Sequence, residues 1–331
     1  MEEGEMKLTF FELEAWQKKY LKEKLKKHQV KFVDDELTIK NAVKAKDAEG
    51  IGVFIYSEVT KEVLDKLPKL KFVVTMSTGF DHIDVKECKK RKIRVSNVPY
   101  YGENTVAEHA IGLMIALGKN LPQAVARTRK GNFDLEGLEG IDMKGKVLGV
   151  VGSGNIGQHV IQIAKAMEME VVVVNRSRDN ELAKKLGFRY VSLNSLLKKS
   201  DIISLHLPLT SKTRHLISMK NVRSIKKGAY IINTARGGLI QTKALIYGLD
   251  KRIIHGAALD VLEGEDELKE ERLHKKLTRA EKRVLRQNHL LLKDKDVLIT
   301  PHSAFYTREA LVRILDRTVE NVLCKGKKNC V

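Results

Sequence analysis

Three side chains with complementary chemistry each follow a short apolar stretch of the chain: Arg236, Glu265 and His302. A guanidinium grips a carboxylate through two parallel hydrogen bonds, and an imidazole exchanges a proton near neutral pH. A carboxylate beside the imidazole orients it and favours its protonated form. Beside a bound dinucleotide, this set predicts hydride transfer to a 2-oxo acid. Arg236 would bind the substrate carboxylate, His302 would supply the proton, and Glu265 would hold His302.

A glycine-rich stretch, Gly152-Ser-Gly-Asn-Ile-Gly157, predicts where the dinucleotide binds. It follows an apolar strand at 147–151 and precedes a helical run, which is the context that makes this weak motif informative. Gly152 would permit a tight turn, Gly154 would let the backbone approach the pyrophosphate, and Gly157 would let the helix pack closely. The pyrophosphate would then lie at the helix N-terminus. The alternative, a glycine turn without a ligand, is disfavoured by the flanking strand and helix.

The end of the second strand of this unit indicates which dinucleotide binds. An NAD site commonly has Asp or Glu there to accept hydrogen bonds from the ribose hydroxyls. This chain has Asn175, followed by Arg176, Ser177 and Arg178. Without a carboxylate to repel a 2′-phosphate, and with two guanidiniums to bind one, the sequence predicts NADP(H) or use of both cofactors. The alternative is that the arginines are merely exposed.

The elements that must position these groups alternate between short apolar strands and amphipathic helices. This pattern predicts an α/β protein with two doubly wound parallel-sheet domains. We expect a Rossmann cofactor domain, 101–299, inserted in a flavodoxin-like substrate domain made of 1–100 and 300–331. Thr105-Val-Ala-Glu108 reads as a capping box that opens a long apolar helix. The expected strands are 7–11, 30–33, 52–56, 71–76, 93–96, 147–151, 171–174, 202–205, 230–233, 257–259 and 297–300.

Two further segments have a helical pattern. The stretch 304–324 is amphipathic and is expected to return to the first domain. The stretch 267–288 is densely charged, with leucines at helical spacing, and should form an amphipathic excursion between Glu265 and His302.

Composition narrows the classes of protein. In 331 residues, 43% are hydrophobic and 31% charged, typical of a globular protein, and no apolar run approaches the ~18 residues of a membrane span. The N-terminus lacks a secretory pattern and the three cysteines are widely spaced, so we expect a cytoplasmic protein with reduced thiols. The net charge of +19 is compatible with nucleic-acid binding, but aromatic residues are only 5% of the chain and no nucleic-acid-binding motif occurs. We therefore expect a solvated lysine-rich surface and no nucleic-acid, membrane or metal partner.

The motifs together resemble the D-isomer-specific 2-hydroxyacid dehydrogenase family, and within it the D-lactate dehydrogenases. The resemblance covers almost the whole chain. Besides the glycine stretch, it is carried by Val53-Phe-Ile-Tyr-Ser57, Ser77-Thr-Gly-Phe-Asp-His-Ile-Asp84, Val98-Pro-Tyr-Tyr-Gly102, Thr105-Val-Ala-Glu-His109, Leu205-His-Leu-Pro208, Ile232-Asn-Thr-Ala-Arg-Gly237, Ala258-Leu-Asp-Val261 and Ile299-Thr-Pro-His-Ser-Ala-Phe-Tyr-Thr307.

The resemblance implies roles for individual residues. Arg236, Glu265 and His302 match the family's catalytic trio. Thr78 and Gly79 match a loop whose backbone N–H groups bind the substrate carboxylate. The positions lining the side-chain pocket are Tyr56, Tyr101 and Phe305. The cofactor contacts are Gly152, Gly154, Asn155, Ile156, Gly157, Asn175, Arg176, Ser177, Leu207, Pro208, Thr213, Thr234, Ala235, Arg236 and Asp260, the last near the nicotinamide amide.

The sequence leaves the substrate open. We expect NAD(P)H-dependent reduction of pyruvate-like 2-oxo acids by a homodimeric D-lactate dehydrogenase. One alternative is an NADPH-dependent glyoxylate or hydroxypyruvate reductase, suggested by Arg176 and Arg178. Another is a non-catalytic protein that senses the nucleotide, which would have no chemical need for the trio. Three histidines outside the trio are expected to pack or to support the site: His109, His206 and His255.

Overall fold

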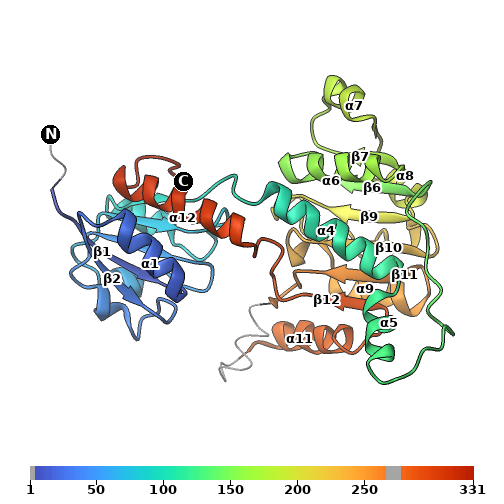
Figure 1. Ribbon diagram of the computed structural model, residues 1–331, viewed down its shortest axis with the longest axis horizontal. Helices are drawn as coiled ribbons and strands as arrows, with labels where there is room; N and C mark the ends of the chain where they lie inside the picture. The colour runs from blue at the N-terminus through green and yellow to red at the C-terminus, as the bar shows by residue number, and fades with distance from the viewer. Residues whose placement is uncertain (1–3, 266–276) are drawn as a thin grey trace. The chain divides into compact units, whose positions relative to one another are not determined.

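The computed structural model describes residues 4–265 and 277–331. The chain folds into two compact units. Unit 1 contains Met1–Tyr101 and Thr307–Val331, so the two ends of the chain share one unit; unit 2 is Gly102–Tyr306. Figure 1 shows the carboxyl-terminal helix α12 beside the amino-terminal elements of unit 1.

Unit 1 is built on a five-stranded parallel sheet with the order β2-β1-β3-β4-β5. This is the flavodoxin-like strand order. The strands are β1 (Lys7–Phe11), β2 (Gln29–Val33), β3 (Gly50–Val53), β4 (Phe72–Thr75) and β5 (Arg94–Ser96). The helices are α1 (Ala15–Lys24), η1 (Ala42–Ala45), α2 (Lys61–Leu64), α3 (Val85–Lys90) and α12 (Arg308–Leu323). Both β3 and β4 are buried along their whole length, as expected of central strands covered on two faces.

Unit 2 is built on a seven-stranded parallel sheet with the order β12-β11-β10-β9-β6-β7-β8. Strand order reverses between β6 and β9, which is where Rossmann sheets bind dinucleotides. The strands are β6 (Val147–Val151), β7 (Glu170–Val174), β8 (Arg189–Tyr190), β9 (Ile202–Leu205), β10 (Ala229–Asn233), β11 (Ile254–Leu259) and β12 (Val297–Ile299). These two sheets confirm the expected α/β class with two parallel-sheet domains.

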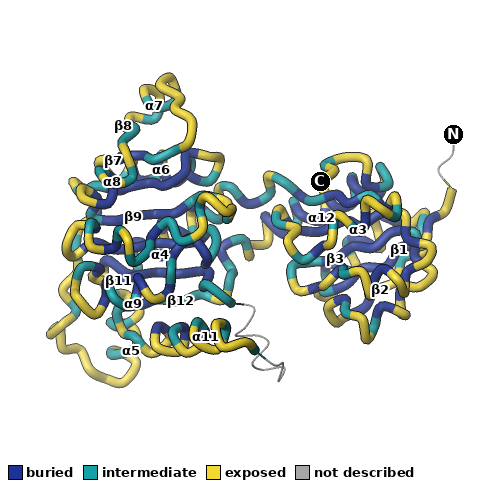
Figure 2. The backbone as a smooth tube through the Cα atoms, turned by 180° about the vertical axis from the view of Figure 1, so that it is seen from behind, coloured by how far each residue is buried: buried dark blue, intermediate teal, exposed yellow. Residues whose placement is uncertain are grey.

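Helices bury the sheet of unit 2 in two apolar clusters. One cluster joins the sheet to α4 and α6, and Figure 1 shows α4 lying across the sheet. The other joins it to α8 and α9. Figure 2 shows the result: central strands such as β9 and β11 are mostly dark blue, while exposed segments lie around them. The helices are α4 (Glu103–Gly118), α5 (Leu121–Thr128), α6 (Asn155–Ala166), α7 (Asn180–Leu186), α8 (Leu193–Lys199), η2 (Val222–Ser224), η3 (Gly237–Leu239), α9 (Thr242–Asp250) and α11 (Arg279–Leu291).

Several predicted element ends differ from the structure; for example, the strand expected at 257–259 already begins at Ile254. The helix expected to open at Thr105 already begins at Glu103, with Gly102 as the N-cap residue and no side-chain cap. Thr105 is buried in the first turn and is therefore not the cap. The strand expected at 52–56 ends at Val53, because the following residues turn away at the carboxyl edge of the sheet.

The charged excursion is only partly described. Leu268 and Leu273 lie outside the described residues. The part after them forms α11, which a reciprocal capping box between Thr278 and Glu281 opens. The helix packs against α9 and buries Leu285.

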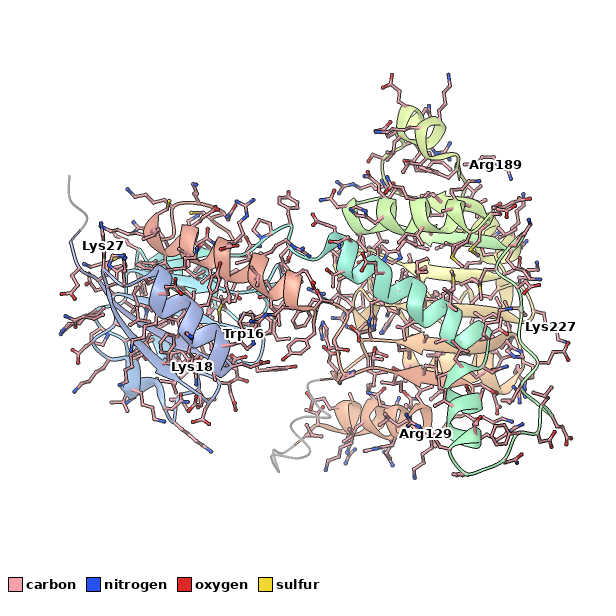
Figure 3. The ribbon with its side chains drawn as sticks, in the orientation of Figure 1. Trp16, Lys18, Lys27, Arg129, Arg189 and Lys227 are labelled. Atoms are coloured by element: carbon pink, nitrogen blue, oxygen red, sulfur yellow. The ribbon has the colours of Figure 1, made fainter. Side chains whose placement is uncertain are left out.

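Charged side chains cover the outside of each unit (Figure 3). The exposed residues Lys27, Arg129, Arg189 and Lys227 project from separate elements. Part of the net charge of +19 is thus carried by separate, solvated side chains. Among the described residues, no helix is long and apolar enough to cross a membrane.

Candidate active site

The glycine loop after β6 has the shape that the sequence predicts. Gly152 has a left-handed backbone, φ +104°, and a Cβ there would lie 2.4 Å from the carbonyl oxygen of His206. A Cβ on Gly157 would lie 2.0 Å from the carbonyl oxygen of Gly152. Glycine at 157 therefore lets α6 approach the loop, and glycine at 152 lets the loop approach the segment after β9. At Gly154, the N-cap residue of α6, a Cβ would meet no atom within 4 Å, and no side chain caps the helix. The N-terminus of α6 therefore faces open space, where its N–H groups suit an anion.

The other expected cofactor residues gather at the same edge of the unit 2 sheet. Parallel strands bring their carboxyl ends together, and these residues follow β6, β9, β10 and β11. They are Asn155, Ile156, Leu207, Pro208, Thr213, Thr234, Ala235 and Asp260. Within the described part of the chain, the buried hydroxyl of Thr234 has no hydrogen-bond partner. A buried polar atom without a partner is costly, so this hydroxyl and the open glycine loop fit a bound dinucleotide.

Some of these residues also have structural contacts of their own, Asn155 and Thr213 among them. The Asn155 amide donates to Glu103 of α4 at 3.2 Å. The Thr213 hydroxyl donates to the Pro208 carbonyl at 2.7 Å and so holds the turn after β9.

The segment after β7 is open to solvent. The half-buried Asn175 amide donates to the Ser177 carbonyl at 2.9 Å, a hydrogen bond within the turn itself. Arg176 and Arg178 are exposed. Over residues 4–265 and 277–331, neither guanidinium forms a hydrogen bond or an ion pair. Both are therefore available to an anionic group beside the turn.

The structure brings His302 and Glu265 into direct contact. The Nδ1 atom of His302 lies 2.7 Å from Oε1 of Glu265, and each side chain is 26% exposed. The other carboxylate oxygen accepts the backbone N–H of Leu262 at 3.3 Å. His302 has a left-handed backbone, φ +55°, held by a hydrogen bond from its N–H to the Thr300 carbonyl at 2.9 Å. No described residue bonds its Nε2 atom, which leaves that nitrogen for a substrate.

The loop that carries Arg236 packs beside the loop that carries Glu265. Asn233, at the end of β10, shapes the first loop: its amide donates to the Arg236 carbonyl at 3.0 Å, and its oxygen accepts the Ala235 N–H at 3.1 Å. A Cβ on Gly237 would lie 1.9 Å from the backbone of Leu262, so only glycine permits this approach. The half-buried Arg236 guanidinium donates to the Ala235 carbonyl at 2.8 Å and retains further N–H groups for a ligand.

Asp260 fixes the loop of His302, a contact that the sequence does not predict. Its buried carboxylate accepts the Thr300 hydroxyl, the Ser303 N–H at 2.9 Å and the Ala304 N–H at 2.8 Å. His109 approaches the same carboxylate at 3.5 Å. Burial raises the pKa of Asp260, but hydrogen bonds from these groups outweigh burial and hold it below its usual value. His109 therefore belongs to this network and does more than pack.

The other two histidines have contacts that agree with a packing role. Burial lowers the pKa of His206 to about 4, so its ring is neutral, and it pairs with the Ser204 hydroxyl at 2.7 Å. His255 lies 5.0 Å from the Tyr230 ring, centroid to centroid. Among the described residues, no group of histidines, cysteines and carboxylates could hold a metal ion.

The residues expected to bind the substrate carboxylate lie in unit 1, directly after β4. The Thr78 hydroxyl donates to the Val98 carbonyl at 3.1 Å, and the Ser77 hydroxyl donates to the Gly79 carbonyl at 2.6 Å. These bonds fix the loop. Tyr56 follows β3 at the same edge and is 46% exposed. The Tyr101 carbonyl accepts from Arg313 at 2.6 Å. In unit 2, Phe305 makes an edge contact with the Tyr306 ring.

Several curated proteins of similar sequence have names that refer to 2-hydroxy acids or 2-oxo acids. A 2-hydroxyacid dehydrogenase homolog of Zymomonas mobilis is 38% identical over 298 residues, covering 89% of this chain and 88% of that protein. The D-lactate dehydrogenase of Escherichia coli is 35% identical over 322 residues, 96% of each chain. A glyoxylate reductase of Thermococcus litoralis is 34% identical over 291 residues, 86% of this chain and 82% of that one.

Solved structures of D-lactate dehydrogenases are also similar to this chain. The apo-structure of the Escherichia coli D-lactate dehydrogenase superposes with a TM-score of 0.86 at 34% identity, covering 98% of this chain and 100% of that one. An Aquifex aeolicus D-lactate dehydrogenase complexed with NAD and lactic acid gives 0.85 at 34% identity, with 98% of each chain covered.

The sequence model for the NAD-binding domain of D-isomer specific 2-hydroxyacid dehydrogenases matches residues 111–304. That range contains the glycine loop, the Asn233–Gly237 loop and the Glu265–His302 pair described above. The chain therefore belongs to the D-isomer specific 2-hydroxyacid dehydrogenase family and is an NAD-dependent oxidoreductase.

Proposed function

We propose that the protein reduces pyruvate to D-lactate. The observation that carries this proposal is the 2.7 Å contact between His302 Nδ1 and Glu265, which leaves Nε2 of the imidazole to face a substrate. When bound, the reduced nicotinamide supplies the hydride. His302 donates a proton from Nε2 to the developing alkoxide, and Glu265 holds the ring and stabilises its protonated form.

The remaining residues hold the substrate. Arg236 binds the carboxylate through its planar fork, which a lysine could not reproduce. By the family resemblance, the backbone N–H groups near Thr78 and Gly79 are also assigned to the substrate carboxylate, and Tyr56, Tyr101 and Phe305 to its side chain. A bound carboxylate orients the carbonyl, so that reaction within the complex replaces a bimolecular encounter.

We propose further that the enzyme uses NADPH as well as NADH. Arg176 and Arg178 are exposed beside Asn175, and no described residue occupies their guanidiniums. A 2′-phosphate would give them an anionic partner.

A glyoxylate or hydroxypyruvate reductase is the second candidate. The similarity to a glyoxylate reductase of Thermococcus litoralis favours it, as does the arginine pair. A panel of pyruvate, glyoxylate and hydroxypyruvate, assayed with NADH and with NADPH, separates the candidates. The proposal expects the highest kcat/KM with pyruvate, and chiral chromatography should identify D-lactate. A higher kcat/KM with glyoxylate than with pyruvate would refute the proposal and support the second candidate.

We also propose a homodimer. Helix α5 and the loop after it expose Leu121, Val125, Phe133 and Leu135 on unit 2, with 46% to 79% of each side chain accessible. Large apolar side chains grouped along one segment are typical of a surface that another chain covers. Light scattering should give twice the chain mass of 37.4 kDa, whereas a monomeric mass would contradict the proposal.

A further inference from the structure

Glu12 lies at the carboxyl end of β1 in an unusual conformation. Its φ of +60° is in the left-handed region, which residues with a side chain rarely adopt unless their surroundings hold them there. Here the side-chain carboxylate holds the residue in this conformation through two hydrogen bonds. Oε2 accepts the backbone N–H of Tyr56 at 3.1 Å, and Oε1 accepts the Ser57 hydroxyl.

The contacts of Ser57 indicate that Glu12 is charged. The Ser57 side chain is fully buried, and its oxygen accepts the Leu37 N–H at 2.8 Å. Its single proton is therefore directed at Glu12, whose two oxygens both act as acceptors, as in an ionised carboxylate.

No positively charged side chain of the described residues balances this carboxylate. Over residues 4–265 and 277–331, no lysine, arginine or histidine forms an ion pair with Glu12. Burial raises the pKa of the carboxyl group despite its hydrogen bonds, which means that water solvates the charge poorly. An unbalanced charge with reduced hydration repels a second anion more strongly than a surface carboxylate does.

The strand order puts this charge next to Tyr56. β1, β3 and β4 are consecutive in the parallel sheet, so their carboxyl ends are neighbours. Glu12 follows β1, Tyr56 follows β3, and Gly79 follows β4. A 2-oxo acid with its carboxylate at the Gly79 loop and its side chain at Tyr56 has Glu12 at the next position along this edge.

We propose that Glu12 determines substrate specificity: its fixed negative charge excludes 2-oxo acids that carry a second carboxylate and confines the enzyme to monocarboxylic ones. The inference rests on the proposed function, since it assigns the substrate class of that same site. Two like charges about 6 Å apart, at an effective dielectric constant of about 40, disfavour binding by about tenfold.

A matched pair of substrates tests this. Oxaloacetate and 4-methyl-2-oxopentanoate have side chains of similar shape, but only the first has a second carboxylate. The unaltered protein should reduce 4-methyl-2-oxopentanoate at least tenfold more efficiently, with products separated chromatographically. Glu12→Gln removes the charge and keeps the size, so the ratio of kcat/KM for oxaloacetate to that for its partner should rise about tenfold.

Asp47→Asn is the control, because it removes an exposed carboxylate that precedes β3, at the opposite edge of the same sheet. Its ratio should equal that of the unaltered protein. An unchanged ratio in Glu12→Gln, an equal rise in Asp47→Asn, or equal efficiency toward both substrates in the unaltered protein would overturn the inference. The comparison of the two substrates in the unaltered protein does not depend on whether a variant folds. Absence of pyruvate turnover would instead refute the proposed function, whereas pyruvate turnover with an unaffected ratio refutes only the role of Glu12.

Discussion

The proposed use of NADPH rests on the turn after β7. The Asn175 amide nitrogen donates to the Ser177 carbonyl at 2.9 Å, and the neutral amide oxygen is the only acceptor that this side chain offers to the ribose hydroxyls of NADH. A 2′-phosphate, in contrast, would find Arg176 and Arg178 beside it. A hydrogen bond between charged groups contributes ~1.5–3 kcal/mol, and exposure reduces this to about 1 kcal/mol, or roughly fivefold in affinity for each arginine.

We therefore expect kcat/KM for NADPH to equal or exceed that for NADH. The double change Asn175→Asp with Arg176→Ala should reverse the order, because it restores a charged ribose acceptor and removes one phosphate partner. The assay is initial-rate pyruvate reduction with each cofactor at low ionic strength. The control is Arg129→Ala, which removes an exposed positive charge at the end of α5 and should leave the preference unchanged. More than tenfold preference for NADH in the unaltered protein would refute the reasoning.

Three further predictions concern the site and its support. Arg236→Lys keeps the charge and loses the fork, so KM for pyruvate should rise tenfold or more with a smaller change in kcat; an unchanged KM in steady-state assays would argue against carboxylate binding there. In Glu265→Gln the imidazolium loses the carboxylate that holds it and stabilises its charge, so kcat for pyruvate reduction should fall about tenfold or more; an unchanged kcat in steady-state assays would remove Glu265 from this role. Burial lowers the pKa of His206 to about 4, so as the pH falls the unfolded chain binds a proton at this residue before the folded chain does. The contribution of His206 to the free energy of unfolding should therefore be fully present above pH ~6.5 and should fall toward pH 4 by at most about 3 kcal/mol. His206→Gln should lessen that fall in urea unfolding, and identical pH dependence in both proteins would contradict the assignment.

The parts of the fold predicted from sequence are those with a local cause. The strand and helix around Gly152 and Gly157 follow from spacing alone, and the structure shows the close backbone approaches that exclude a side chain at both glycines. Apolar runs such as 147–151 become buried strands because a parallel sheet covered on both faces leaves no polar side.

The parts that could not be predicted depend on distant residues. Phe54 to Tyr56 continue the apolar pattern of β3, yet the strand stops at Val53, and Glu12, which follows β1, binds the turn after it. The contacts of Asp260 with His109 and Thr300 likewise join three segments that no local pattern connects. Thr105 matched a capping pattern, but the helix had already begun at Glu103.

His302 as the proton donor is the central claim, and single-turnover kinetics of pyruvate reduction test it most directly. His302→Gln keeps a polar side chain of similar size but cannot give up a proton. With NADH bound beforehand, its rate of cofactor oxidation should fall ~10²–10⁴-fold, while NADH affinity measured by fluorescence stays within about threefold of the unaltered protein. A single-turnover rate within about threefold of the unaltered enzyme, at equal NADH affinity, would contradict the claim.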